Sequence, residues 1–217
     1  MPKVLHLNCF DPGELGLWRI EESEDWLRRE TDLYPSEIEQ LNQIKGEGRR
    51  CEFLAARLLL HQLSGRQRRG ALIKDDFGKP RLESSNWHIS ISHTSGFSAA
   101  YAHPKACGVD VQILVPKISR LAPKFINETE AANLRTEEPA ILLMQQHLVW
   151  GAKEVIYKAY GRRQLDFKQH LTVDLASATA GQGQLKAYLL KDDLLINYRL
   201  DYRVLEGKYM LVIGVEG

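Results

Sequence analysis

The first half of the chain contains short stretches in which apolar and polar residues alternate, and one long stretch of helical period. Alternation predicts strands at residues 4–8, 15–20, 71–74, 79–82, 87–92, 97–102 and 107–115. We expect the last three of these strands to form one sheet. A short helix is expected after Ser23, and helical spacing then runs from Pro35 to a stop at Gly65. The core side of this stretch is predicted to include Leu54, Leu58 and Leu59.

The second half begins near Pro104 and follows a similar order of elements. Helical pieces are expected over residues 119–135, and a long helix is expected from Pro139 to about Tyr160, ended by Gly161. Strands are then predicted at residues 171–175, 184–190, 194–204 and 209–215. Helices and strands are segregated rather than alternating, which favours an α+β fold with two halves, residues 1–103 and 104–217.

The composition is that of a globular protein with balanced charge. Of the 217 residues, 44% are hydrophobic and 26% are charged, and the formal net charge is +1. This balance argues against nucleic-acid binding through a general positive field. No stretch approaches the roughly 20 consecutive apolar residues of a membrane span, and the N-terminus lacks the apolar run of a signal peptide. We therefore expect a cytoplasmic protein that does not associate with membranes.

The three cysteines, Cys9, Cys51 and Cys107, are widely spaced and form no CxxC pair. This spacing argues against a disulfide framework and against structural zinc. We expect small buried thiols in a reducing compartment.

One short stretch combines groups that can hold a phosphate. A strand is expected to end near Ser92, so that Ser92, His93 and Thr94 lie in a turn to which Gly96 gives conformational freedom. Hydroxyl, imidazole and backbone N–H groups at such a turn can bind a phosphate. An ordinary polar turn would have the same residues.

Two further stretches carry carboxylates. Asp110 and Gln112 are two residues apart on one predicted strand, so they share a face, and their oxygens suit a hard divalent cation. On the long helix, Trp150, Glu154 and Lys158 are spaced to lie on one face. Taken singly, each group also has a purely structural interpretation. Asp110 and Gln112 are typical of a solvated strand face, Trp150 of a core position, and Glu154 with Lys158 of a surface ion pair.

In combination and in this order, the residues resemble the 4′-phosphopantetheinyl transferase superfamily. The resemblance rests on Gly78-Lys79-Pro80, Ser92-His93, Gly108-Val109-Asp110 and Trp150-x-x-Lys153-Glu154-x-x-x-Lys158, and on a first-half helix at residues 51–60. The chain length and the two-half plan are similar to the monomeric, surfactin-synthetase-activating type rather than to the shorter trimeric holo-acyl-carrier-protein synthases. The motifs lie between Arg49 and Lys158, about half of the chain.

The resemblance implies a pseudo-dimer of two similar α+β halves, each a long helix packed on a small antiparallel sheet, with the active site in the cleft between them. It implies a monomeric enzyme that transfers 4′-phosphopantetheine from coenzyme A to a serine of an apo acyl, polyketide or peptidyl carrier protein. The reaction would use Mg²⁺ and release 3′,5′-ADP.

The resemblance also assigns residues. Asp110 and Glu154 would be the carboxylate ligands of Mg²⁺, and the amide oxygen of Gln112 would bind the metal or a metal-bound water, although many family members have Glu at the position of Gln112. Glu154 is the expected acceptor of the serine proton, and Lys158 and Lys153 are expected to hold phosphate charge. The expected contacts of the coenzyme A phosphates are Arg49, Arg50, Arg57, Lys79, Ser92 and His93.

Two alternatives remain open at this stage. The first is a protein of the same fold that binds coenzyme A or a carrier without turnover. The second is a metal-dependent phosphohydrolase acting on nucleotides, which would need a water nucleophile and would not need a carrier.

Overall fold

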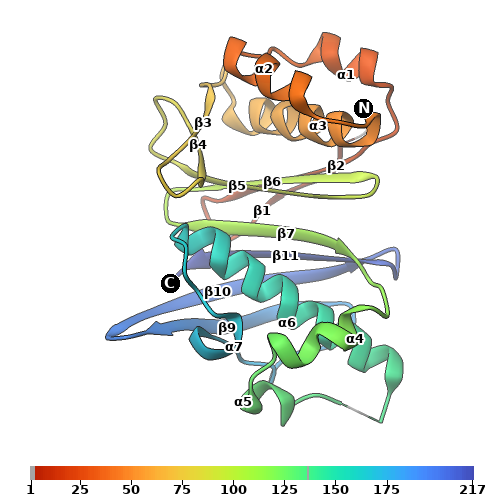
Figure 1. Ribbon diagram of the computed structural model, residues 1–217, viewed down its shortest axis with the longest axis vertical. Coiled ribbons are helices and arrows are strands. Elements are labelled where there is room, and N and C mark those ends of the chain that lie inside the picture. Colours follow the sequence, from red (N-terminus) through yellow and green to blue (C-terminus); the bar gives the residue numbers. More distant parts are fainter. Residues whose placement is uncertain (1–2, 136) are drawn as a thin grey trace. The chain divides into compact units, whose positions relative to one another are not determined.

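A computed structural model describes residues 3–135 and 137–217 of the chain. It consists of two compact units, unit 1 (Met1–Lys105) and unit 2 (Ala106–Gly217), and each unit contains helices and one antiparallel sheet (Figure 1). The predicted α+β class is therefore confirmed. The boundary after Lys105 lies close to the expected one after residue 103.

The sheet of unit 1 is built from hairpins. Its spatial order is β1 (Lys3–Asn8), β2 (Glu14–Arg19), β6 (Phe97–His103), β5 (His88–Thr94), β4 (Pro80–Leu82) and β3 (Leu72–Lys74). Each of these strands overlaps a predicted stretch. Strand β5 extends to Thr94, and the turn follows at Ser95 and Gly96. Ser92 is therefore inside the strand, paired with Ala99, rather than in the turn where we expected it.

The helices of unit 1 are α1 (Glu24–Glu30), capped by Ser23 as predicted, α2 (Pro35–Gln43) and α3 (Glu47–Ser64). The single helical stretch expected from Pro35 is thus divided in two. Gly46, at the start of α3, has a φ of 89°, a conformation that a glycine adopts without strain and that interrupts the helix. Helix α3 packs on β2 and β6. The predicted core residues Leu54, Leu58 and Leu59 are all buried.

The sheet of unit 2 has the spatial order β7 (Cys107–Ile113), β11 (Tyr209–Glu216), β10 (Leu194–Leu205), β9 (Gln182–Lys191) and β8 (Leu171–Val173). Our prediction that residues 107–115 share a sheet with the two preceding strands is wrong. Strand β6 already pairs with β5 on one side and β2 on the other, so it offers no free edge, and β7 pairs with β11 instead.

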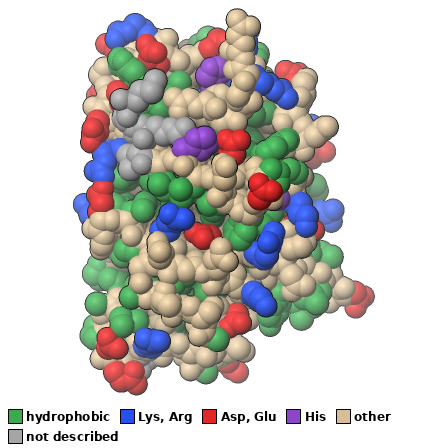
Figure 2. All heavy atoms as spheres, turned by 180° about the vertical axis from the view of Figure 1, so that it is seen from behind, with side chains coloured by type: hydrophobic (Ala, Val, Ile, Leu, Met, Phe, Trp, Pro, Cys, Tyr) green, Lys and Arg blue, Asp and Glu red, His purple; other side chains and the backbone are tan. Residues whose placement is uncertain are grey.

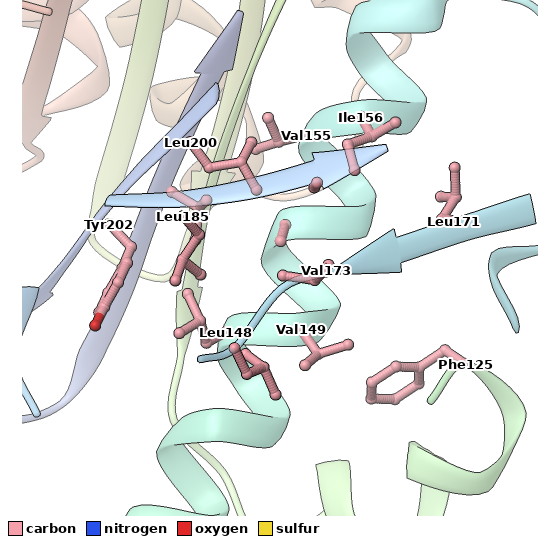
Figure 3. Close-up of a cluster of buried hydrophobic side chains, with 14 of the residues drawn as sticks. Phe125, Leu148, Val149, Val155, Ile156, Leu171, Val173, Leu185, Leu200 and Tyr202 are labelled. Carbon is pink, nitrogen blue, oxygen red and sulfur yellow. The ribbon is translucent and has the colours of Figure 1, made fainter. Parts of the chain in front are cut away.

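The long helix of unit 2, α6 (Pro139–Tyr160), has the predicted bounds, with a proline in its first turn and Gly161 in the left-handed conformation at its end. Shorter helices are α4 (Ile118–Leu121), the 3₁₀ turn η1 (Ala122–Lys124), α5 (Glu128–Ala131) and α7 (Phe167–His170). Helix α7 was not predicted. Figure 3 shows the apolar side of α6, including Leu148, Val149 and Val155, packed with side chains of the strands.

Several expectations from composition can be compared with the described residues. Cys51 and Cys107 are buried, as expected, whereas Cys9 is only partly buried. Within residues 3–135 and 137–217, no helix is both long and apolar enough to cross a membrane. On the face drawn in Figure 2, positive and negative side chains are interspersed, in line with the net charge of +1.

Candidate functional site

Strand β7 and helix α6 approach each other closely because two glycines leave room. A side chain on Gly108 of β7 would collide with the backbone carbonyl of Val155 in α6. In the opposite direction, a Cβ on Gly151 of α6 would lie 2.8 Å from the Gln112 Nε2 atom of β7. The polar side chains of β7 therefore lie directly against those of α6 within unit 2.

Asp110 is held by donors on both of its carboxylate oxygens. It is 7% exposed. The Lys158 ammonium donates to Asp110 Oδ1 at 2.9 Å and to the Val109 carbonyl at 2.8 Å. Gln112 Nε2 donates to Asp110 Oδ2 at 3.1 Å, which confirms that Asp110 and Gln112 share a face of the strand. Hydrogen bonds to both oxygens hold the carboxylate in one orientation.

The Gln112 side chain presents its NH₂ group, not its oxygen, to Asp110. Its Oε1 atom lies 2.7 Å from His147 Nδ1, and its Nε2 atom also donates to the His147 carbonyl at 3.2 Å. This orientation does not fit the expectation that Gln112 offers an oxygen to a metal ion. An amide NH₂ cannot be a cation ligand, and the amide oxygen is already engaged by His147.

Glu154 is half-buried on α6, and its carboxylate has no hydrogen bond or ion pair to any other described residue. The surface pair expected between Glu154 and Lys158 is not formed, because Lys158 is bonded to Asp110. Burial raises the pKa of Glu154; the Lys158 charge opposes this shift and the Asp110 charge adds to it. A desolvated carboxylate next to an ionised one has the electrostatics of a cation site or of a proton acceptor.

The structure buries Lys153 in unit 2 and places the partly buried Trp150 against the core of that unit. The Lys153 ammonium is fully buried and donates to the Phe125 carbonyl at 2.6 Å, to Glu130 Oε2 at 2.7 Å and to the Phe167 carbonyl at 2.9 Å. These bonds use all three of its protons. Lys153 is therefore a structural ion-pair partner, and it does not fit the expected role of holding phosphate. Trp150 packs edge-on against Phe125, with ring centroids 5.1 Å apart.

In unit 1, two of the expected phosphate contacts meet at a cavity of about 710 Å³ beside the first turn of α3. Arg49 Nη1 lies 3.0 Å from His93 Nδ1 and 3.1 Å from Glu52 Oε2. The cavity is lined by Ile20, residues 46–49, Cys51, Glu52 and residues 93–96. A cation, an imidazole and the N–H groups at a helix start can bind an anion, but the Glu52 carboxylate lies 3.0 Å from His93 Nδ1 and also pairs with Arg49, so a bound phosphate would compete with Glu52.

The other expected phosphate contacts do not line that cavity. Arg50 is paired with Glu24 at 2.8 Å. Arg57 is buried, stacks on the Phe53 ring with 3.1 Å to the ring centroid, and faces Glu37, so it belongs to the core. The Ser92 side chain is buried, and Lys79 is partly buried with its backbone N–H bonded to Asp75 Oδ1.

Sequence reasoning missed His147 and Glu52. His147 is buried, and the Val115 N–H group lies 2.9 Å from its Nε2 atom. Burial lowers the pKa of His147, against the opposing effects of Val115 and of the Asp110 charge. The helical spacing of His147, Gly151 and Glu154 along α6 was the signal that could have identified His147.

No group of three or more His, Cys, Asp or Glu side chains able to hold a metal ion occurs in the described part of the chain. A cation at Asp110 and Glu154 would therefore need further oxygen ligands from a substrate or from water. The chain matches no protein-family model and no curated protein sequence.

Proposed function

We propose that the protein is a 4′-phosphopantetheinyl transferase that moves the phosphopantetheine arm of coenzyme A onto a serine of an apo acyl, polyketide or peptidyl carrier protein. The observation that carries the proposal is the pair of unlike carboxylates in unit 2. Asp110 is held by Lys158 and Gln112, whereas Glu154 has no hydrogen-bonding partner among the described residues.

The two carboxylates fit Mg²⁺, which prefers a few carboxylates together with phosphate oxygens and water. Asp110 and Glu154 are the proposed ligands, and the pyrophosphate of coenzyme A would complete the set. When bound, Mg²⁺ supplies charge neutralisation of the phosphates during displacement.

The residues of the chain have separate proposed roles. Lys158 fixes the Asp110 carboxylate and adds positive charge beside the reacting phosphate. Glu154 accepts the proton of the carrier serine, a role favoured by its raised pKa. The serine oxygen then forms a bond to the β-phosphorus, and the bond from that phosphorus to 3′,5′-ADP breaks.

In unit 1, we propose that Arg49 and His93 bind phosphate groups of coenzyme A at the cavity beside α3. Lys79 and Arg50 remain weaker candidates, and Lys153, Arg57 and the buried Ser92 are left out of the contact set. The pseudo-dimer arrangement, the monomeric state and the cytoplasmic location also belong to this proposal.

The test is a carrier-loading assay with coenzyme A, Mg²⁺ and several apo carrier proteins, read by the mass of the carrier. Asp110→Asn and Glu154→Gln keep the side-chain shape and remove charge, and each is expected to lower transfer at least about a hundredfold at saturating Mg²⁺. Asp193→Asn, in an exposed turn, is the matched control and should transfer like the parent.

Three outcomes would change the proposal. Loading by both site variants near the parent rate would remove the carboxylate pair from the site. Binding of coenzyme A or carrier without loading would favour a binding protein of the same fold. Phosphate release in the absence of any carrier would favour a phosphohydrolase.

A further inference from the structure

The orientation of the Gln112 amide is determined by the groups around it. One end of the amide lies 3.1 Å from Asp110 Oδ2 and 3.2 Å from the His147 carbonyl oxygen, and both of these atoms are acceptors. The end that faces them must therefore be the NH₂ group. The amide oxygen then faces His147 Nδ1 at 2.7 Å, so that nitrogen must carry a proton.

The second nitrogen of His147 completes the chain of hydrogen bonds. Two atoms of Val115 lie near Nε2, the N–H at 2.9 Å and the carbonyl oxygen at 3.1 Å; in a neutral ring with its proton on Nδ1, Nε2 accepts from the N–H. The bonds then run in one direction, from Val115 N–H to His147, from His147 to Gln112 and from Gln112 to Asp110. The links from His147 to Gln112 and from Gln112 to Asp110 fix each other's orientation, and they require a proton on Nδ1.

We infer that His147 is a positioning residue for Asp110, acting through Gln112, and that Gln112 serves as a hydrogen-bond donor to Asp110 rather than as a cation ligand. This inference rests on the proposed function in taking Asp110 as the residue that meets the cation. It extends that function by assigning roles to two side chains that carry no charge at the site.

The chain of bonds controls which lone pairs of Asp110 are available. Lys158 donates to Oδ1 and Gln112 donates to Oδ2, so the carboxylate is held from both sides. The absence of a side chain at Gly151 leaves the space beside the Gln112 amide. If His147 lost its donor, the amide could turn its oxygen toward Asp110 and repel it.

Two variants of His147 separate this role from a packing role. The side-chain nitrogen of Asn reaches the position of the imidazole Nδ1, whereas Gln reaches the position of Nε2. His147→Asn therefore keeps the donor to Gln112, and His147→Gln keeps only the contact with Val115. We expect His147→Gln to raise the Mg²⁺ concentration for half-maximal transfer about five- to tenfold, the equivalent of one hydrogen bond, and His147→Asn to stay closest to the parent.

A third and a fourth variant test whether His147 acts through Gln112. Gln112→Leu should raise the Mg²⁺ requirement by a similar factor, and adding His147→Gln to Gln112→Leu should raise it no further. Additive effects would overturn the proposed route. If His147→Asn raised the Mg²⁺ requirement more than His147→Gln, the contact with Val115 would be the one that matters. That result would overturn the positioning role of His147.

Nitrogen-15 NMR of the imidazole and of the Gln112 side-chain amide gives a readout that is independent of transfer. The parent and His147→Asn should show a protected Gln112 NH₂ group, the parent should show a neutral ring with its proton on Nδ1, and His147→Gln should lose the amide protection. If the parent transfers nothing, the proposed function fails while these spectra still decide the hydrogen-bond chain. A ring protonated on Nε2 alone would overturn it.

Discussion

Unit 1 and unit 2 each bury one glutamate at the third position of a short helix, Glu37 in α2 and Glu130 in α5. In each case Oε2 accepts the N–H of the residue that caps the helix. The other oxygen, Oε1, accepts the N–H of a residue in an edge strand of the sheet, β3 in unit 1 and β8 in unit 2. The capping residues are Tyr34 and Asn127, and the strand residues are Leu72 and Val173. The two units therefore share a detailed pattern that was not visible as a sequence repeat.

The cations opposite these glutamates differ. In unit 1, Arg69 binds Glu37 through two nitrogens, at 2.8 and 2.6 Å, and Arg57 of α3 lies 3.5 Å away. The Arg57 Nε atom makes no hydrogen bond, and burial lowers the pKa of Arg57 to about 9. In unit 2, Lys153 of α6 is the single cation and is fully bonded. Two cations therefore face Glu37 in unit 1, whereas among the described residues of unit 2 Lys153 alone is paired with Glu130.

The same comparison can be made at the contact of strand and long helix. A glycine in the strand faces the helix in both units, Gly16 opposite Leu59 and Gly108 opposite Val155. Counting from these contacts, the strand residue two positions after the glycine in unit 1 is equivalent to the one in unit 2. The helix residue one position before the glycine's contact in unit 1 is likewise equivalent to the one in unit 2. They are Trp18 and Leu58 in unit 1, and Asp110 and Glu154 in unit 2.

The equivalent positions have opposite chemistry. Trp18 and Leu58 belong to the apolar core of unit 1, whereas Asp110 and Glu154 form the candidate site of unit 2. The scaffold itself does not require a carboxylate at either position, because unit 1 packs without one. This difference is in line with the proposed roles of Asp110 and Glu154, which packing alone would not require.

The largest effect is expected where unit 2 has a single cation. Lys153→Met leaves the buried Glu130 carboxylate without its cation, although two backbone N–H groups remain, and should lower the free energy of unfolding by about 3–5 kcal/mol. Denaturant titration followed by circular dichroism measures the change. The double variant Lys153→Met with Glu130→Gln should recover part of the loss, and the exposed Lys124→Met is the control. An unchanged midpoint for Lys153→Met would contradict the structural role.

A smaller effect is expected at the unit 1 cavity. His93→Ala should weaken coenzyme A binding by about 1.5–3 kcal/mol, the range for a hydrogen bond to a charged group. Lys79→Ala should weaken it less, since Lys79 does not line the cavity. Titration calorimetry measures both affinities. If His93→Ala binds coenzyme A like the parent, His93 does not contact coenzyme A. The proposal that the unit 1 cavity binds its phosphates would then be wrong.

The unit 1 counterpart of Lys153 is expected to matter less. Arg57→Met should cost about 1–2 kcal/mol of unfolding free energy, because Arg69 still neutralises Glu37 and a methionine keeps the packing on Phe53. The measurement is the same denaturant titration. A loss as large as that of Lys153→Met would mean that the two cations of unit 1 act as one inseparable group.

The smallest effect is a pH dependence at Glu154. A carboxyl whose folded-state pKa is raised contributes stability that is present at acidic pH and is lost as the pH rises through the folded pKa. Without added metal, Glu154→Gln should therefore be about 1 kcal/mol or less more stable than the parent near pH 7, and this advantage should vanish below about pH 4. Thermal unfolding across this range gives the curve, and parallel curves for parent and variant would contradict the shift.

Local signals were sufficient for much of the fold. Helix α6 begins at a proline and ends at a glycine in the left-handed conformation, so Pro139 and Gly161 marked its bounds. The face shared by Asp110 and Gln112 followed from strand alternation. The pairing of β7 with β11 could not be predicted, because it joins segments about 100 residues apart and no local pattern encodes it.

The roles of individual side chains were harder to predict than the elements. Lys153 and Lys158 lie on the same helix and look alike in the sequence, but one is fully buried against Glu130 and the other meets Asp110. The orientation of the Gln112 amide depends on His147, 35 residues away. Such roles follow from the acceptors and donors that the fold brings together, and these are set by tertiary contacts.

Gly108 carries no functional group, yet the candidate site depends on it. Any side chain at this position would meet the backbone of Val155, which cannot turn aside as a flexible side chain could. The strand and the helix would have to separate, and Asp110 and Glu154 would part with them. The proposed activity would therefore be lost through a substitution that leaves every polar residue of the candidate site intact. A survey of natural variants that compares only the reactive groups would count such a chain as active.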